Sequence, residues 1–204
     1  MNLIKYIDIN SNPLDPHSID GLVNYYKVYL DNDEAFKYVE FHGENGIEGI
    51  EYYLAPNETI EQVFERFPNE KTITFYTDKE TRGIYSKYTE LVVDNYYNIL
   101  GKRIQVYGND LLPIYDQALD VNTNEKLHFD KTYYDRVRNI HYEFEYDRTT
   151  GDFKQLTVTD NGNNFDVKNW MVYPHMVGVG RNPFDFDWEG FEYYKHADPI
   201  LPID

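Results

Sequence analysis

The stretch "YYKVYLDNDEAFKYVEF", Tyr25 to Phe41, contains two runs in which apolar and polar residues alternate. Asp31 to Glu34 separate the runs, and these residue types favour tight turns. A period of two is typical of a strand that buries one face. The stretch therefore predicts a β-hairpin, and repetition of such hairpins decides the fold class.

Similar strand-like runs continue along the chain, at 3–9, 46–55, 71–94, 101–110, 125–135, 139–158 and 169–180. Pro174 lies in the last run, which favours an edge strand or a bulge there. Residues 111–120 fit a strand or a helical turn. Ile19, Leu22, Val23 and Tyr26 have helical spacing, so a short helix before the first hairpin is an alternative.

One helix is predicted over roughly 58–67. Its apolar residues follow the spacing i, i+3, i+4, i+7: Ile60, Val63, Phe64 and Phe67. Thr59 and Gln62 have the spacing of a capping box, and Pro68 ends the run. We expect one acidic β-rich domain over 1–204, of the α+β class: a mainly antiparallel sheet built from hairpins, with one or two short helices packed on it.

The composition supports a folded protein rich in strands. The chain of 204 residues has 21 Tyr and 12 Phe but only four Ala. It has no Cys, which excludes disulfides and thiolate metal sites. No apolar run approaches the roughly 20 residues that cross a bilayer, and the start "MNLIKYIDIN" does not resemble a signal peptide. These features favour a cytoplasmic location.

A short pattern, Asp-x-x-Thr, occurs between strand-like runs at Asp78, Asp120 and Asp147. Asp and Thr side chains bond nearby backbone groups in tight turns. The pattern therefore predicts three turns of similar chemistry. Their irregular separations do not indicate a solenoid.

The chain is strongly acidic, with a net charge of −17. Residues 31–65 carry ten acids and one lysine, and residues 184–204 carry six acids and one lysine. Such a chain should bind neither nucleic acid through its phosphates nor anionic lipid. Cations or basic proteins are the expected charged partners, although solvated surfaces would account for the charge equally well.

The C-terminal stretch "PFDFDWEGFEYY", Pro183 to Tyr194, alternates rings and carboxylates up to Glu189. As a strand, it would bury its rings and expose its acids. After Gly190, however, rings follow on both parities. Rings beside carboxylates are typical of interface anchors whose acids pair with Arg or Lys.

The sequence contains no recognisable catalytic or metal-binding motif. The six His lack the spacing of metal ligands, and neither G-x-S-x-G nor a Walker lysine occurs. The calcium-loop pattern beginning at Asp120 fails, because Glu125 replaces its glycine and Lys131 its terminal acid. We therefore expect no cofactor and no catalysis. A hydrolase with two carboxylates from distant strands remains a third alternative.

An acidic, Tyr-rich chain with these two acidic segments and no catalytic motif resembles the immunity proteins of bacterial polymorphic-toxin systems. The resemblance implies a stoichiometric inhibitor that covers the active site of a partner toxin. Toxins that act on nucleic acids have basic clefts, to which an acidic inhibitor would be steered.

The predicted partner-binding residues come from both acidic segments. They are Asp185, Asp187, Trp188, Glu189, Glu192, Tyr193, Glu40, Glu44, Glu48 and Glu51. The alternative is a carbohydrate- or peptide-binding β domain with an aromatic platform, which predicts weak binding that does not depend on salt.

Overall fold

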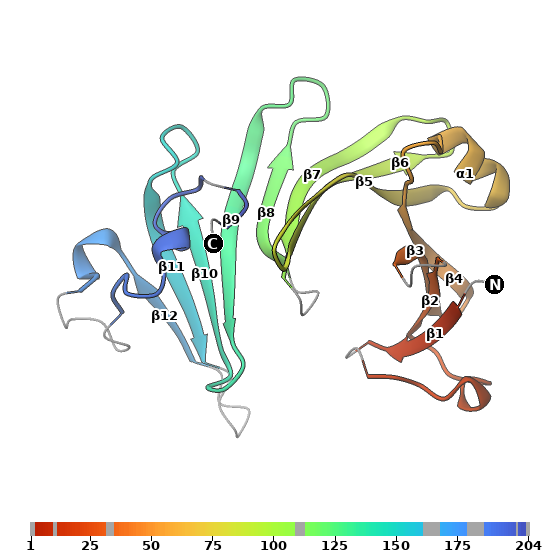
Figure 1. Cartoon of the computed structure of the whole chain (residues 1–204), viewed down its shortest axis with the longest axis horizontal. Coiled ribbons are helices and arrows are strands. Elements are labelled where there is room, and N and C mark those ends of the chain that lie inside the picture. The colour runs from red at the N-terminus through yellow and green to blue at the C-terminus, as the bar shows by residue number, and fades with distance from the viewer. Residues whose placement is uncertain are drawn as a thin grey trace. The chain divides into compact units, whose positions relative to one another are not determined.

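The computed structural model describes residues 3–9, 12–31, 35–108, 113–160, 168–178, 186–198 and 200–202 (Figure 1). Within them, twelve strands form one sheet whose order follows the sequence. The strands are β1 (Leu3–Asp8), β2 (Tyr25–Leu30), β3 (Phe36–Gly43), β4 (Gly46–Tyr53), β5 (Thr72–Arg82), β6 (Tyr85–Asp94), β7 (Ile99–Tyr107), β8 (Pro113–Leu119), β9 (Lys126–Asp135), β10 (Ile140–Tyr146), β11 (Phe153–Asp160) and β12 (Lys168–Val172). The prediction of a mainly antiparallel sheet is confirmed, and the sheet is larger than expected.

The chain divides into two compact units. Unit 1 comprises Met1–Asp78 and Thr89–Lys102, and unit 2 comprises Lys79–Tyr88 and Arg103–Asp204. The boundary in β5 follows Asp78, whose φ of 52° is left-handed. Because β5, β6 and β7 contribute to both units, the single domain over 1–204 stays a prediction.

The core of unit 1 is covered by a helix, α1 (Ile60–Arg66). The predicted capping box is present, with Thr59 and Gln62 each accepting a hydrogen bond from the backbone of the other. The helix buries Val63 and Phe64 in the core cluster, and the Phe64 ring lies 6.0 Å from that of Phe75 in β5. It also connects β4 to β5, which pair in parallel and so require a crossover.

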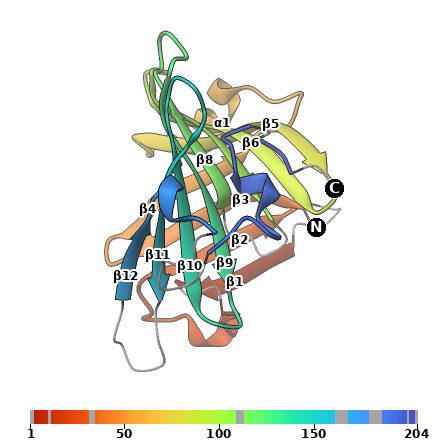
Figure 2. The ribbon, with the colours of Figure 1, turned by 90° about the vertical axis from the view of Figure 1, so that its left-hand side faces the viewer.

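The core of unit 2 is covered by an irregular segment, residues 186–198 and 200–202, which we call the strap. Figure 2 shows it crossing β9 and β10. Phe144 of β10 is fully buried beneath it, and the strap residues Phe186, Phe191 and Tyr194 all pack in this core. The ring of Phe144 stacks on that of Tyr194, with centroids 4.7 Å apart.

Two of the three predicted Asp-x-x-Thr turns are confirmed. Asp120 accepts hydrogen bonds from the backbone amides of Asn122 and Thr123. Asp147 accepts the equivalent bonds from Thr149 and Thr150. The third prediction is wrong, because Asp78 to Thr81 lies inside β5 and the chain turns later, at Gly83, whose φ is 55°.

Two smaller alternatives are also decided. Residues 19–24 form no helix, and the only helical turn before β2 is the 3-10 segment Pro16–Ser18 in this described part of the chain. Residues 113–119 of the ambiguous stretch form a strand, β8. Pro174 follows β12, which lies at the end of the strand order as an edge strand.

Candidate partner-binding site

The strap carries most of the predicted C-terminal site residues, but it is not a strand. Phe186 and Asp187 have no regular structure, and Glu192–Tyr194 form a 3-10 turn. The assumption of a strand up to Glu189 is therefore wrong for its described part, and Asp185 lies outside the described residues. Asp187, Glu189 and Glu192 are exposed, as their proposed role requires.

The two predicted anchor rings pack within unit 2 itself. Trp188 is half-buried, with its ring edge-on to that of Phe153 at 4.9 Å. The Tyr193 ring lies 3.6 Å from Lys131 Nζ, and its hydroxyl donates to the Ile200 carbonyl at 2.6 Å. Much of the ring area is thus already in use, and a role for these rings in partner binding stays a prediction.

Lys131 in β9 donates hydrogen bonds to the backbone of the strap. It is fully buried, and its Nζ donates to the carbonyl oxygens of Tyr193 at 2.6 Å and His196 at 2.8 Å. Tyr146 adds a third bond, from its hydroxyl to the Tyr194 carbonyl at 2.9 Å. Burial lowers the pKa of Lys131 to about 7, although the negative charge of Asp198 opposes the shift.

The four predicted acids of unit 1 do not form one surface. Glu40 is only 6% exposed and lies within hydrogen-bonding reach of Tyr29 and His42. Glu51 is on the opposite sheet face, because Ile50 rather than Glu51 pairs with Glu40. Glu44, in the turn, and Glu48, in β4, are exposed. Glu40 and Glu51 therefore lie on opposite faces of the sheet, and a role for these four acids in partner binding stays a prediction.

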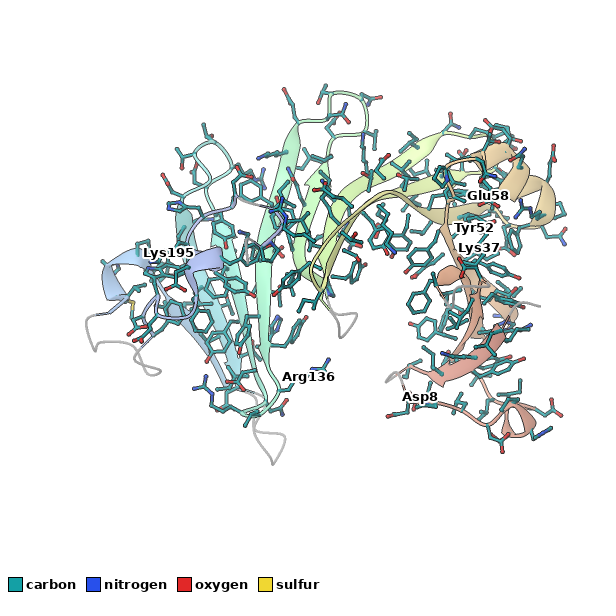
Figure 3. All side chains as sticks on the ribbon, viewed as in Figure 1. Asp8, Lys37, Tyr52, Glu58, Arg136 and Lys195 are labelled. Carbon is teal, nitrogen blue, oxygen red and sulfur yellow. The ribbon has the colours of Figure 1, made fainter. Side chains whose placement is uncertain are left out.

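A further acid of unit 1, Glu58, has its negative charge balanced by Lys37 and Arg66 within the unit. Figure 3 shows Glu58 beside Lys37 and Tyr52. It accepts hydrogen bonds from Lys37, from Tyr52 at 3.0 Å, from the Ala55 amide at 3.1 Å and from Arg66 at 3.1 Å. Burial alone would raise the pKa of Glu58, but these bonds outweigh it and lower the pKa to about 2.

The structure brings together three other carboxylates, Asp116, Asp130 and Glu145, which we call the carboxylate row. Asp130 in β9 pairs directly with Asp116 in β8 and with Glu145 in β10. By alternation along β9, the row lies on the sheet face opposite the one that Lys131 and the strap occupy. We call this opposite face the polar face of unit 2.

A basic side chain lies beside each carboxylate of the row, but the pKa of Asp130 is still raised. Arg103 bonds Asp116 at 3.1 Å, His128 lies 2.8 Å from Asp130, and Lys154 lies 3.6 Å from Glu145. Their side chains are about half exposed, whereas that of Asp130 is 16% exposed. Burial raises the pKa of Asp130 to about 6; His128 opposes the shift, and the charges of Asp116 and Glu143 add to it.

Sequence reasoning missed the carboxylate row because charge was summed along the chain. Residues 66–183 hold 17 acids and 15 bases and so looked neutral. The usable signal was strand parity in β9 and β10, where Asp130 and Glu145 share their parity with other polar residues, whereas Asp116 shares its parity with Ile114 and Ala118. Only the register of three strands, however, places the three carboxylates side by side.

Comparisons with known proteins identify no relative. No protein-family model matches the chain, and neither a curated protein nor a solved structure is significantly similar to it. Within the described ranges, no helix is long and apolar enough to cross a membrane. The same residues place no group of three or more His, Asp or Glu where they could hold a metal ion.

Proposed function

We propose that the protein binds a basic protein partner and acts as a stoichiometric inhibitor that covers the partner's basic site. The carboxylate row is the observation that carries this proposal. Like charges directly opposed on neighbouring strands destabilise a sheet. Arginine or lysine side chains of a partner would relieve that repulsion and form charge-assisted hydrogen bonds with the same carboxylates.

The electrostatics of the whole chain favour the same kind of partner. A net charge of −17 attracts a basic surface over long range and accelerates association at low salt. Approach of a cation would also lower the raised pKa of Asp130, so binding near pH 6 should release protons. Both effects are measurable without knowledge of the partner's activity.

The finer part of the proposal is that the partner is a toxin and this chain its immunity protein. It rests on the resemblance of type described above and on the acidic surface. A nuclease-type toxin has a basic site for phosphates, and carboxylates that occupy such a site would exclude the nucleic acid. The exposed strap acids Asp187, Glu189 and Glu192 offer a second acidic patch in the same unit.

The aromatic-platform alternative finds less support. In unit 1, Tyr25 stacks on His42 with centroids 4.8 Å apart, and Tyr29 stacks on Tyr38 at 4.0 Å. The facing sides of these rings are therefore occupied by one another. A sugar stacks on free ring faces, and stacking within these pairs leaves each ring at most one such face.

The hydrolase alternative would need a substrate pocket over a pair of acids. Asp116 and Asp130 are close, and one has a raised pKa, as general acids do. The neighbouring cavity of about 420 Å³ is lined by Glu145 and Asp147 but by neither of these two acids. A substrate held there would reach only one carboxylate of the row.

The test is affinity capture from the source cells with three baits. These are the native chain, the row variant Asp116→Asn/Asp130→Asn/Glu145→Gln, and the strap variant Asp187→Asn/Glu189→Gln/Glu192→Gln. Both variants remove three negative charges, so they differ only in where the charge is lost. A basic protein that is retained by the native chain and the strap variant, but lost with the row variant, supports the proposal.

Other outcomes divide the proposal into its parts. Loss with the strap variant alone would move the interface to the strap and leave the function standing. If the captured protein is not basic, or if its association rate does not change between 50 and 300 mM salt, the steering argument is wrong. An uninhibited activity in the saturated complex would contradict the inhibitor role.

A further inference from the structure

Unit 1 contains a small apolar cavity on the sheet face opposite Glu40. Its volume is about 250 Å³, and it is lined by Tyr26, Val39, Phe41, Gly49, Ile50, Glu51 and Thr74. We call it the notch. It is smaller than the cavities that hold drug-sized ligands, which start near 300 Å³, and its size suits a single side chain.

Strand register explains how the notch forms. Tyr26 pairs with Phe41, and Phe41 pairs with Gly49, so these residues form one row across β2, β3 and β4. The next row contains Val39, Glu51 and Thr74. The first row ends at a residue without a side chain, which leaves space in the notch that Phe41 and Glu51 both line.

The backbone at Gly49 does not require glycine. Its φ lies outside the left-handed region, and a Cβ atom built there meets no atom within 4 Å. The bulge in this hairpin falls between Phe41 and His42, so it leaves Gly49 in register with Phe41. The missing side chain therefore creates space rather than relieving strain. A glycine inside a strand marks a bulge, a bend, or the close approach of a ligand or another backbone.

The walls of the notch combine rings and negative charge. The rings of Tyr26 and Phe41 are tilted at 43° with centroids 5.3 Å apart. The protein surrounding the Glu51 carboxylate displaces water and raises its pKa, and the negative charge of Glu90 adds to the shift. The rest of the Glu51 side chain is exposed to solvent. A group that suits this site has an apolar stem and a positively charged end.

We infer that the notch receives an arginine side chain of a protein partner. Arginine suits the walls better than lysine, because its guanidinium is weakly hydrated, packs on aromatic rings and bonds carboxylates in a fixed geometry. Its aliphatic stem would contact Val39 and Phe41 and its charged end Glu51. The inference deepens the proposed function by naming a group of the basic partner, and it places that group in unit 1.

The inference is tested without the partner, using two small probes and the full-length, 15N-labelled chain. The probes are Nα-acetyl-arginine methylamide and its neutral analogue Nα-acetyl-citrulline methylamide. We expect the arginine probe to shift the amide resonances of Phe41, Gly49 and Thr74, with a dissociation constant on the order of 1 mM. The citrulline probe should bind at least tenfold more weakly.

Two variants and a control locate the binding. Gly49→Val fills the notch and should weaken binding at least tenfold, while the melting temperature stays equal or rises, because valine favours strands. Glu51→Gln should weaken binding about fivefold. Glu61→Gln removes the same charge from an exposed position on α1 of unit 1 and should change binding less than twofold.

Several results would overturn the inference: equal binding of the arginine and citrulline probes, tighter binding of a third probe, Nα-acetyl-lysine methylamide, or unchanged binding to Gly49→Val. If Gly49→Val fails to fold, equal effects of the Glu51 and Glu61 substitutions decide against the inference. A Gly49→Val bait that still captures the partner would reject the notch as a contact while the proposed function stands.

Discussion

The two units cover their cores in different ways. The difference shows which parts of the fold are specified by neighbouring residues and which by residues far apart in the sequence. In unit 1, α1 covers the sheet with a regular stripe of apolar residues and a capping box of its own. In unit 2, the strap has almost no regular structure and is fixed by bonds from Lys131 and Tyr146. A helical cover such as α1 is specified by a few neighbouring residues. The strap instead depends on hydrogen-bond donors about 50 to 60 residues earlier in the chain.

The largest expected effect tests how far unit 2 depends on the strap. Phe144→Ala removes a fully buried ring on which the strap rings pack, so unit 2 should lose about 3–5 kcal/mol of unfolding free energy. The chain's two tryptophans, Trp170 and Trp188, both belong to unit 2, so urea unfolding followed by tryptophan fluorescence reports on this unit. Phe75→Ala in unit 1 is the matched control, and it should leave the midpoint of the fluorescence transition almost unchanged. An equal shift of that midpoint in Phe75→Ala would contradict the assignment of the effect to the core of unit 2.

The second prediction concerns Glu58, the acid of unit 1 whose charge Lys37 and Arg66 balance. Glu58 has its pKa lowered to about 2, so its contribution to stability is present above the unfolded pKa near 4.3 and is lost as the pH falls toward 2. Glu58→Gln should therefore cost unit 1 about 2 kcal/mol at pH 7, about a quarter of that at pH 2.5 and almost nothing near pH 1. Hydrogen exchange of β4 and α1 amides measures the loss. A cost that is independent of pH would show that shape, not charge, matters there.

The third prediction concerns Lys131 in unit 2. Its pKa of about 7 lies below the unfolded value near 10.4, so between these values the unfolded chain binds more protons and stability rises with pH. The native chain should gain about 2 kcal/mol from this group between pH 7 and pH 9. Lys131→Met should lack that gain, whereas Lys126→Met, at an exposed position of the same strand, should keep it. Parallel pH profiles for all three chains would refute the assignment.

The smallest expected effect has the opposite sign. The pKa of Asp130 is raised to about 6, so the folded unit holds its proton more tightly than the unfolded chain, and stability falls as the pH rises from 4 to 6. The shift alone corresponds to about 3 kcal/mol, but the substitution also weakens the contact with His128. Asp130→Asn should therefore stabilise unit 2 by about 1 kcal/mol at pH 7.5 and have no effect near pH 4. Glu125→Gln, which removes an exposed charge nearby, is the control. Destabilisation at pH 7.5 would mean that the bond to His128 outweighs the crowding.

The sequence was sufficient where structure depends on near neighbours. The Thr59–Gln62 capping box and the turns at Asp120 and Asp147 are each complete within about six residues. The same Asp-x-x-Thr pattern failed at Asp78, because strand pairing extends β5 to Arg82 and the turn forms at Gly83 instead. A local pattern therefore predicts a turn only where the sheet permits one.

The candidate sites were not predictable in the same way. The carboxylate row combines residues from β8, β9 and β10, and the notch combines β2, β3, β4 and β5. Both depend on register, which a single sequence does not fix. The alternating "PFDFDWEGFEYY" stretch was misleading for a related reason. Its described rings Phe186, Phe191 and Tyr194 pack on Phe144 of β10, and no strand alternation buries them.

The order of the strap and its sheet along the chain has a consequence for biosynthesis. Phe144 leaves the ribosome about 50 residues before Tyr194, the strap ring that stacks on it. At about 5–20 residues per second, this interval is roughly 3–10 s. During that time the strap cannot yet cover the aromatic face of β9 to β11. Hydrophobic surface of this kind recruits chaperones or associates with other nascent chains, so the yield of native protein should depend on translation speed between β10 and the strap.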